Sequence, residues 1–259
     1  MWLTILPFVL MAVAVVVVPG LAVNFAAGLR PVNALCLAPL SSVGLLSLAA
    51  IIAPLVGLRW SLLPVVLLSV LLALVVGGLR RLLARTRAAP LPTDASILPG
   101  ISRPWRAKTT VAMAGGFVMA ATLLSLDGVR MLGSPTAFSQ TYDNIYHLNA
   151  VRWIVDHGNG SSLAFNMTTG DGPASFYPSA WHDLVSAALI GMGSTDVTRG
   201  NNAAIIVVLA LVWPLSCLTL ARILFPPSAT IYLASGLLAA SIGAFPYLLL
   251  GFGVLFPNF

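Results

Sequence analysis

The sequence predicts an all-α, polytopic transmembrane helical bundle of about six spans, with a large extracytoplasmic loop that carries short helices. Of the 259 residues, 59% are hydrophobic and only 8% are charged, whereas a soluble domain has roughly 25% charged residues. The apolar residues form long continuous runs, and about 20 apolar residues are enough to cross a bilayer core. A β-barrel is disfavoured, because its strands would alternate in polarity over roughly ten-residue segments.

The first segment, residues 1–79, predicts three membrane-spanning helices. Their apolar runs are Leu3–Val18, Asn33–Leu58 and Leu62–Leu79. A short polar connector that contains Asn24, Arg30 and Pro31 separates the first two runs, and Arg59–Ser61 forms a tight turn before the third.

Residues 80–108 form a basic segment that we expect to be a cytoplasmic loop. The segment holds seven of the thirteen basic residues of the chain and one acidic residue, Asp94. Short cytoplasmic loops of membrane proteins carry an excess of Lys and Arg. Topology therefore explains the positive charge, and we expect no nucleic-acid partner.

The rest of the chain alternates between spans and one long polar loop. Residues 109–126 predict the fourth span, which leads into an extracytoplasmic loop at 127–202, and residues 203–259 predict two further spans, Ala203–Leu220 and Ala229–Leu250. Within the loop, Asp183–Gly193 is apolar over eleven residues, which suits an interfacial or re-entrant helix rather than a span. The chain ends without a polar tail, so we expect it to be part of a longer protein.

The loop at 127–202 collects the titratable residues and is the expected site of any chemistry. All three histidines and six of the seven acidic residues lie in it. Apolar residues recur at three- and four-residue steps from Tyr142 to His157, which predicts a helix that ends at Gly158. Asp143 and His147 are four residues apart on this helix and share a face, with Arg152 nearby.

Asp143 also lies near the helix start, where the helix dipole favours a carboxylate. We therefore expect it to act as a general base or to bind a cation.

A second cluster runs from Phe176 to Asp183. Tyr177 and Trp181 offer flat aromatic faces, and His182 and Asp183 add polar groups beside them. Aromatic rings next to polar side chains at a membrane surface suit a substrate that joins a sugar to a lipid. The alternative is anchoring, since Trp and Tyr are enriched at membrane interfaces without any substrate.

No cofactor is required by the sequence, but two metal sites are open alternatives. Asp143, His147 and His182 could supply three ligands of a catalytic zinc. A Mg²⁺ or Mn²⁺ ion held by Asp143 and the phosphate of a donor fits better, because Mg²⁺ commonly binds one or two carboxylates together with phosphates. No Gly-rich phosphate-binding motif for a nucleotide occurs.

Four segments together resemble an uncharacterised actinobacterial membrane family that is grouped with the GT-C glycosyltransferases. These segments are Tyr142–Gly158, Phe176–His182, Ala244–Tyr247 and Leu255–Asn258. The resemblance implies a transferase that uses a polyprenyl-phosphate-linked sugar and carries an essential acidic residue in an extracytoplasmic loop. It makes Asp143 the catalytic carboxylate, and His147, Tyr177, Pro178 and His182 the residues that shape the site. Typical GT-C proteins have more spans and place the acidic loop after the first one.

The sequence thus predicts a plasma-membrane glycosyltransferase of cell-wall biogenesis, or the N-terminal part of one. The expected partners are a polyprenyl-phosphate-linked sugar, a glycan acceptor and membrane lipid. In this hypothesis Asp143 deprotonates the acceptor hydroxyl, and Arg152 or Arg130 neutralises the departing phosphate. The substrate-binding residues are His147, Arg152, Tyr177, Trp181, His182 and Asp183. One alternative is a non-catalytic scaffold of the cell envelope. The other is a transporter component for lipid-linked saccharides, which is disfavoured because the predicted spans contain almost no ionisable residues.

Overall fold

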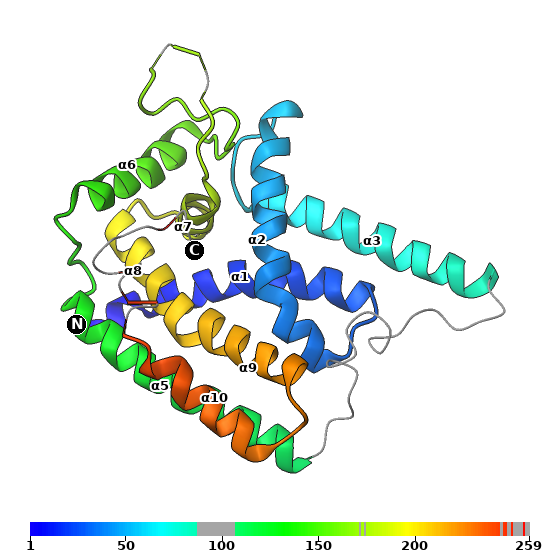
Figure 1. The fold of residues 1–259 in the computed structure, drawn as a ribbon. Coiled ribbons are helices and arrows are strands. Elements are labelled where there is room, and N and C mark those ends of the chain that lie inside the picture. The colour runs from blue at the N-terminus through cyan, green and yellow to red at the C-terminus, as the bar shows by residue number, and fades with distance from the viewer. Residues whose placement is uncertain are drawn as a thin grey trace.

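The protein is an all-α helical bundle (Figure 1). The structure is a computed structural model, and it describes residues 1–86, 107–170, 172–173, 175–243, 246–247, 250 and 256. The N-terminal part contains α1 (Leu6–Ala26), α2 (Pro31–Leu55) and α3 (Leu62–Thr86), with a short 3₁₀ turn at Trp2–Ile5 before α1. In the described residues the only extended pairing is one isolated bridge between Phe165 and Ser175.

The second half begins with the long helix α5 (Ala107–Leu132). Two short helices, α6 (Tyr142–His157) and α7 (Ala180–Gly191), follow. The chain then forms one 28-residue helix, Val197–Leu224, made of α8 (Val197–Val207), a π-helical stretch at Val208–Val212 and α9 (Trp213–Leu224). The helix α10 (Ala229–Ser241) comes last.

Five helices of the described chain are long and apolar enough to cross a membrane, which confirms a polytopic membrane fold. The expected sixth span, Ala229–Leu250, differs from the prediction: α10 has 13 residues and ends at Ser241, because the backbone becomes extended at Ile242 (φ −87°, ψ 102°). The other helices extend beyond their apolar runs, except that α2 ends at Leu55, before the predicted end at Leu58. Pro19 lies inside α1, and α3 continues through the first arginines of the basic segment, whose residues 87–106 lie outside the described part.

Small residues allow two helix pairs to pack with their backbones in contact. On α1, a Cβ at Gly20 would lie 2.2 Å from the Ala38 carbonyl oxygen of α2. Gly20 N–H also donates to Ser42 Oγ at 2.8 Å. The helices α5 and α10 lie side by side (Figure 1), and a Cβ at Gly236 would lie 2.2 Å from the Gly116 carbonyl oxygen. Close approach at glycine is a common way for helices to associate in membranes.

Opposite ends of the bundle carry different charge. At one end, the Arg80 side chain of α3 donates to the Ala27 carbonyl in the α1–α2 connector. At the other end, the α2–α3 turn contacts the α6–α7 region, where Trp60 N–H donates to the Gly158 carbonyl at 2.7 Å. The five described aspartates all belong to this second end, at positions 127, 143, 156, 183 and 196. The contacts therefore agree with the up-and-down order of helices that the sequence predicts.

The helices α6 and α7 differ in burial although they are neighbours in the chain. The short helix α7 packs against α1, α2, α6 and α8, and every residue from Trp181 to Leu189 is buried. Of the two predicted alternatives for this segment, an interfacial and a re-entrant helix, enclosure by other helices favours the second. The neighbouring helix α6 buries one face only.

Candidate functional site

The predicted helix α6 has the predicted bounds, and its two candidate residues face different environments. Gly158 ends the helix in the left-handed conformation (φ 68°), and its N–H donates to the Ile154 carbonyl. Asp143 is exposed in the first turn, whereas His147 is 5% exposed. The four-residue spacing therefore places a solvent-accessible carboxylate one turn before a buried imidazole.

The α2–α3 turn holds α6 and α7 in place. Besides the backbone bond from Trp60 to Gly158, the Trp60 indole N–H donates to Ser186 Oγ on α7 at 2.9 Å. The Arg59 guanidinium donates to the Asp156 carbonyl near the end of α6. Because Trp60 is 2% exposed and lies about 100 residues earlier in the chain, sequence periodicity gives no sign of this support.

The Ser179 hydroxyl at the start of α7 is shared between the loop after α6 and Asp183. Ser179 Oγ lies 2.9 Å from the Gly160 carbonyl oxygen and 2.9 Å from Asp183 Oδ2, and it can donate to either. A hydroxyl has one proton to donate. That proton serves one of the two acceptors at a time, so Ser179 gives Asp183 only part of a hydrogen bond.

Burial supports the neutral form of Asp183. The residue is fully buried, and this burial raises the pKa of its carboxyl well above the ordinary value, against the opposing effect of the Ser179 hydrogen bond. Its Oδ1 has no hydrogen-bond partner among the described residues. A Cβ at Gly160 would lie 2.5 Å from Oδ1, so only glycine leaves room for the carboxyl group.

Two histidines from different helices meet in the interior. His147 Nδ1 and His182 Nε2 are 3.0 Å apart, and the Tyr177 hydroxyl lies 3.4 Å from His147 Nδ1. Burial, followed by the neighbouring His147, lowers the pKa of His182 to about 3. One hydrogen bond therefore joins His147 to the neutral ring of His182.

Tyr177 links this buried pair to the exposed carboxylate. Its ring stacks on Phe165, with centroids 5.2 Å apart, and lies beside Tyr146. Burial is the main reason that the pKa of Tyr177 is raised, and the negative charge of Asp143 adds to the effect. Asp143 is thus within electrostatic range of the His147–His182–Tyr177 cluster.

One predicted residue, Trp181, is buried behind this cluster rather than facing solvent. Trp181 is 6% exposed and donates from its indole N–H to Asn201 Oδ1 at 3.0 Å. Its ring stacks on Phe256 at 4.3 Å, and the Phe256 ring also lies 5.1 Å from His147. Sequence reasoning singled out neither Phe256 nor Asn201 as a site residue, because both join the site through tertiary contacts.

The two arginines expected to meet a phosphate lie in exposed ion pairs. Arg152 Nε is 2.8 Å from Asp156 Oδ2, and Arg130 Nη1 is 3.1 Å from Asp127 Oδ1. Arg152 lies on the exposed face of α6, whereas His147 lies on the buried face. The structure therefore does not bring Arg152 to the histidine pair.

The candidate zinc ligands do not form a metal site in the described part of the chain. No three His, Cys, Asp or Glu side chains converge there as metal ligands. The two histidines bond to each other, and Asp143 faces solvent.

An apolar cavity of about 320 Å³ lies next to the cluster, between α2 and the long helix α8–α9. Pro178, Trp181 and Phe256 line its end near the cluster, and Val43 and Leu40 of α2 line another part. Leu40 is 76% exposed, so the cavity borders the outer, lipid-facing surface of the bundle. The site thus combines a polar group at the surface with an apolar recess beneath it.

Comparison with known protein families identifies one match. Residues 13–259 match the family of unknown function DUF6541 over nearly the whole chain. The chain belongs to the DUF6541 family. Neither the curated proteins nor the solved structures gave a significant match. Membership in DUF6541 carries no activity with it, so function has to be argued from the site.

Proposed function

We propose that this DUF6541 protein is a membrane glycosyltransferase that moves a sugar from a polyprenyl-phosphate donor to a cell-envelope glycan. One observation carries the proposal: the exposed Asp143 carboxylate lies one turn of α6 from His147 of the His147–His182–Tyr177 cluster, and an apolar cavity adjoins that cluster. A substrate that joins a sugar phosphate to a long hydrocarbon needs such a pairing of polar and apolar surfaces.

Asp143 is the catalytic residue in this proposal. The acceptor hydroxyl attacks the anomeric carbon of the donor sugar, the bond from that carbon to the phosphate oxygen breaks, and the proton passes to Asp143. General-base assistance of this kind contributes roughly 10²–10⁴ in rate. An exposed carboxylate without an ion-pair partner among the described residues is free to take the proton.

The buried residues act as positioning residues. Tyr177 is the partly exposed member of the cluster, and its hydroxyl, 3.4 Å from His147 Nδ1, can orient the hydroxyl groups of a sugar. The neutral His182 holds His147, and Asp183 ties the start of α7 to Gly160 through Ser179. Neither His182 nor Asp183 carries a charge that could bind phosphate.

The cavity between α2 and α8–α9 would hold the first part of the lipid chain. Its described lining is almost entirely apolar, with Cys36 and Ser216 as the exceptions. The cavity adjoins the cluster through Trp181. A phosphate at the cluster could therefore remain attached to a hydrocarbon chain that stays in the bilayer.

The charges at the two ends of the bundle support an orientation in the plasma membrane. Arg80, Arg81, Arg85 and Lys108 lie at the end opposite to the aspartates, where they have the excess of positive charge typical of cytoplasmic loops. Arg130, Arg152 and Arg199 at the other end each pair with an aspartate. In this proposal the site therefore faces the extracytoplasmic side.

The test is complementation of cells that lack the gene. Wild type and Asp143→Asn are expressed at matched levels, and the envelope glycans are analysed. We expect wild type to restore a glycan that Asp143→Asn does not restore. Equal restoration by both would remove Asp143 from the chemistry, and failure of wild type to change any glycan would contradict a transferase function.

A further inference from the structure

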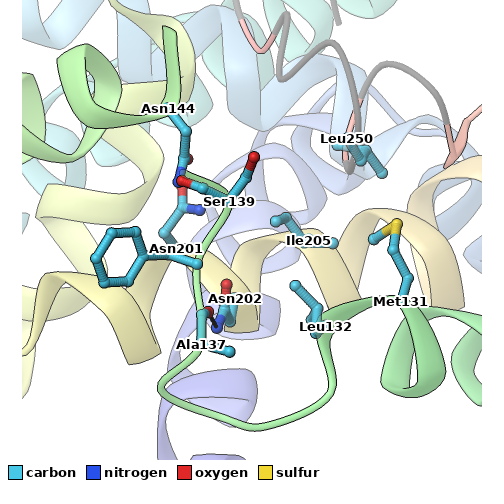
Figure 2. A pocket seen from close by; sticks show the side chains of 10 residues that line it. Met131, Leu132, Ala137, Ser139, Asn144, Asn201, Asn202, Ile205 and Leu250 are labelled. Atoms are coloured by element: carbon cyan, nitrogen blue, oxygen red, sulfur yellow. Dashed lines mark hydrogen bonds between the residues drawn. The ribbon is translucent and has the colours of Figure 1, made fainter. Parts of the chain in front are cut away.

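A second cavity, of about 200 Å³, lies on the other side of the start of α6 (Figure 2). It is enclosed by the end of α5, the loop at 137–139, the first turn of α6 and the first turns of α8. Its lining residues are Met131, Leu132, Ala137, Phe138, Ser139, Asn144, Asn201, Asn202, Ile205 and Leu250. None of these described residues is charged, so the polar lining consists of neutral groups.

The orientation of the Asn201 amide is fixed by Trp181. An indole N–H can only donate, so the atom of Asn201 that it meets at 3.0 Å is the oxygen. The amide nitrogen then lies on the other branch of the side chain. It donates to no residue in the described part of the chain, although Asn201 is only 2% exposed. A buried amide therefore presents unused N–H groups to the cavity.

The side-chain amides of two further asparagines have the opposite orientation, with the nitrogen bonded to the protein and the oxygen unused among the described residues. Asn202 donates from Nδ2 to the Pro135 and Ala137 carbonyls at 3.0 and 2.7 Å, and Asn144 donates from Nδ2 to the Ser139 carbonyl at 2.8 Å. Both side chains are at most 2% exposed. Because the nitrogens are used by the loop, the oxygens remain as acceptors. The cavity thus offers a donor and acceptors at set positions.

This lining selects a class of ligand. An anion would need a basic group, and a cation would need a carboxylate, but neither occurs among the described lining residues. Hydroxyl groups both donate and accept, so they match a lining of fixed amide donors and acceptors. Phe138, which is 42% exposed, adds an aromatic face at the cavity. A few placed polar groups beside apolar ones are typical of small-molecule sites.

We propose that this cavity is a binding site for a neutral pyranose or furanose ring. Asn144, which lines the cavity, directly follows Asp143 in the chain, so the cavity and the proposed catalytic carboxylate belong to the same first turn of α6. The inference deepens the proposed function by assigning a sugar subsite to Asn144, Asn201 and Asn202.

The test measures sugar binding rather than transfer. Purified full-length protein in lipid nanodiscs is mixed with methyl glycosides of common hexoses and pentoses at millimolar concentration, and saturation-transfer NMR detects binding. Ala137→Leu fills the cavity without removing a hydrogen bond, because Asn202 bonds to the backbone carbonyl. Ala114→Leu, the same change at an exposed position of α5, is the matched control.

We expect saturation transfer to at least one glycoside with wild type and Ala114→Leu, and its loss with Ala137→Leu. Inorganic phosphate should not compete. Absence of transfer with wild type, equal transfer with both variants, or displacement by phosphate would each overturn the inference.

The two proposals fail separately. If no glycoside binds but Asp143→Asn abolishes glycan formation, only the sugar site is wrong. If a glycoside binds but Asp143→Asn keeps full glycan formation, the sugar site stands and the catalytic assignment falls.

Discussion

The helices α6 and α7 carry the same kinds of residue but place them in opposite environments. Each has an aspartate and a histidine near its start, at Asp143 and His147 in α6 and at His182 and Asp183 in α7. Asp143 of α6 faces solvent, whereas both titratable residues of α7 are fully buried. Residue type alone therefore does not say which group is available for chemistry.

Protonation follows from this difference in burial. Burial raises the pKa of Asp183 and so favours its neutral acid, and burial next to His147 lowers the pKa of His182 and so favours its neutral base. Charged forms of both would lose solvation without gaining a partner of opposite charge. The α7 pair consequently stabilises the fold, and Asp143 on α6 is the carboxylate that can exchange protons with a substrate.

The largest effect on stability is expected where α7 meets the loop after α6. Gly160→Ala would place a Cβ 2.5 Å from Asp183 Oδ1 and 3.2 Å from the Trp60 ring. We expect a loss of about 3 kcal/mol in unfolding free energy, at the upper end of overpacking effects. Gly44→Ala is the control, since no atom lies within 4 Å of its added Cβ. Denaturant titration in detergent micelles measures both; equal stability would mean that the contact is not tight.

Ser179→Ala should have the next largest effect. It removes the hydroxyl that joins the Gly160 carbonyl to Asp183, and leaves two buried polar groups without a partner. An unsatisfied buried group costs about 1–3 kcal/mol, so we expect a loss of about 2 kcal/mol in unfolding free energy. Ser241→Ala, at an exposed position of α10, should change little. Equal losses in the two variants would contradict the role of Ser179.

Asp183→Asn should change the pH dependence of stability more than stability itself. The amide oxygen can still accept from Ser179, so we expect a change within about 1 kcal/mol near neutral pH. Folding raises the pKa of Asp183, so its contribution is complete below the unfolded pKa of about 3.9 and declines as pH rises toward the folded pKa. His182 acts in the opposite direction: its folded pKa of about 3 lies below the unfolded value of about 6.5, so stability is lost as pH falls between them.

Both proteins contain His182, so the difference between their thermal midpoints isolates Asp183. As pH rises above the unfolded pKa of about 3.9, wild type should lose stability relative to Asp183→Asn. Parallel curves for the two proteins would show that Asp183 is not a neutral buried acid.

The smallest effect is expected on the exposed face of α6. Arg152→Ala breaks an ion pair with Asp156 in which both side chains are nearly half exposed, and such surface pairs contribute little. We expect no measurable change in thermal unfolding and full restoration of the glycan in cells. A loss of glycan with normal folding would instead support the predicted phosphate-binding role of Arg152.

Local sequence patterns predicted α6 well, because its signals lie within the helix. Apolar spacing set the buried face, and Gly158 marked the end. The same periodicity separates Arg152 from His147, since the two residues lie on opposite faces. The apolar run Asp183–Gly193 also predicted a short helix, and α7 spans Ala180–Gly191.

Contacts between distant segments could not be predicted in the same way. His147 meets His182 across 35 residues, and Trp60 reaches Ser186 across 126. These contacts depend on how the α2–α3 turn packs against the loop, and no single helix contains that information. The amide cavity depends equally on the meeting of α5, α6 and α8.

The most direct test of the role of Asp143 is to replace one aspartate by asparagine on each of the two helices. Asp143→Asn and Asp183→Asn are compared with wild type for restoration of the envelope glycan, with matched amounts of protein in the membrane. We expect Asp143→Asn to lose the glycan although its thermal unfolding midpoint equals that of wild type. We expect Asp183→Asn to restore the glycan. If Asp183→Asn abolishes the glycan and Asp143→Asn restores it, the buried aspartate is the functional one and the central claim is wrong.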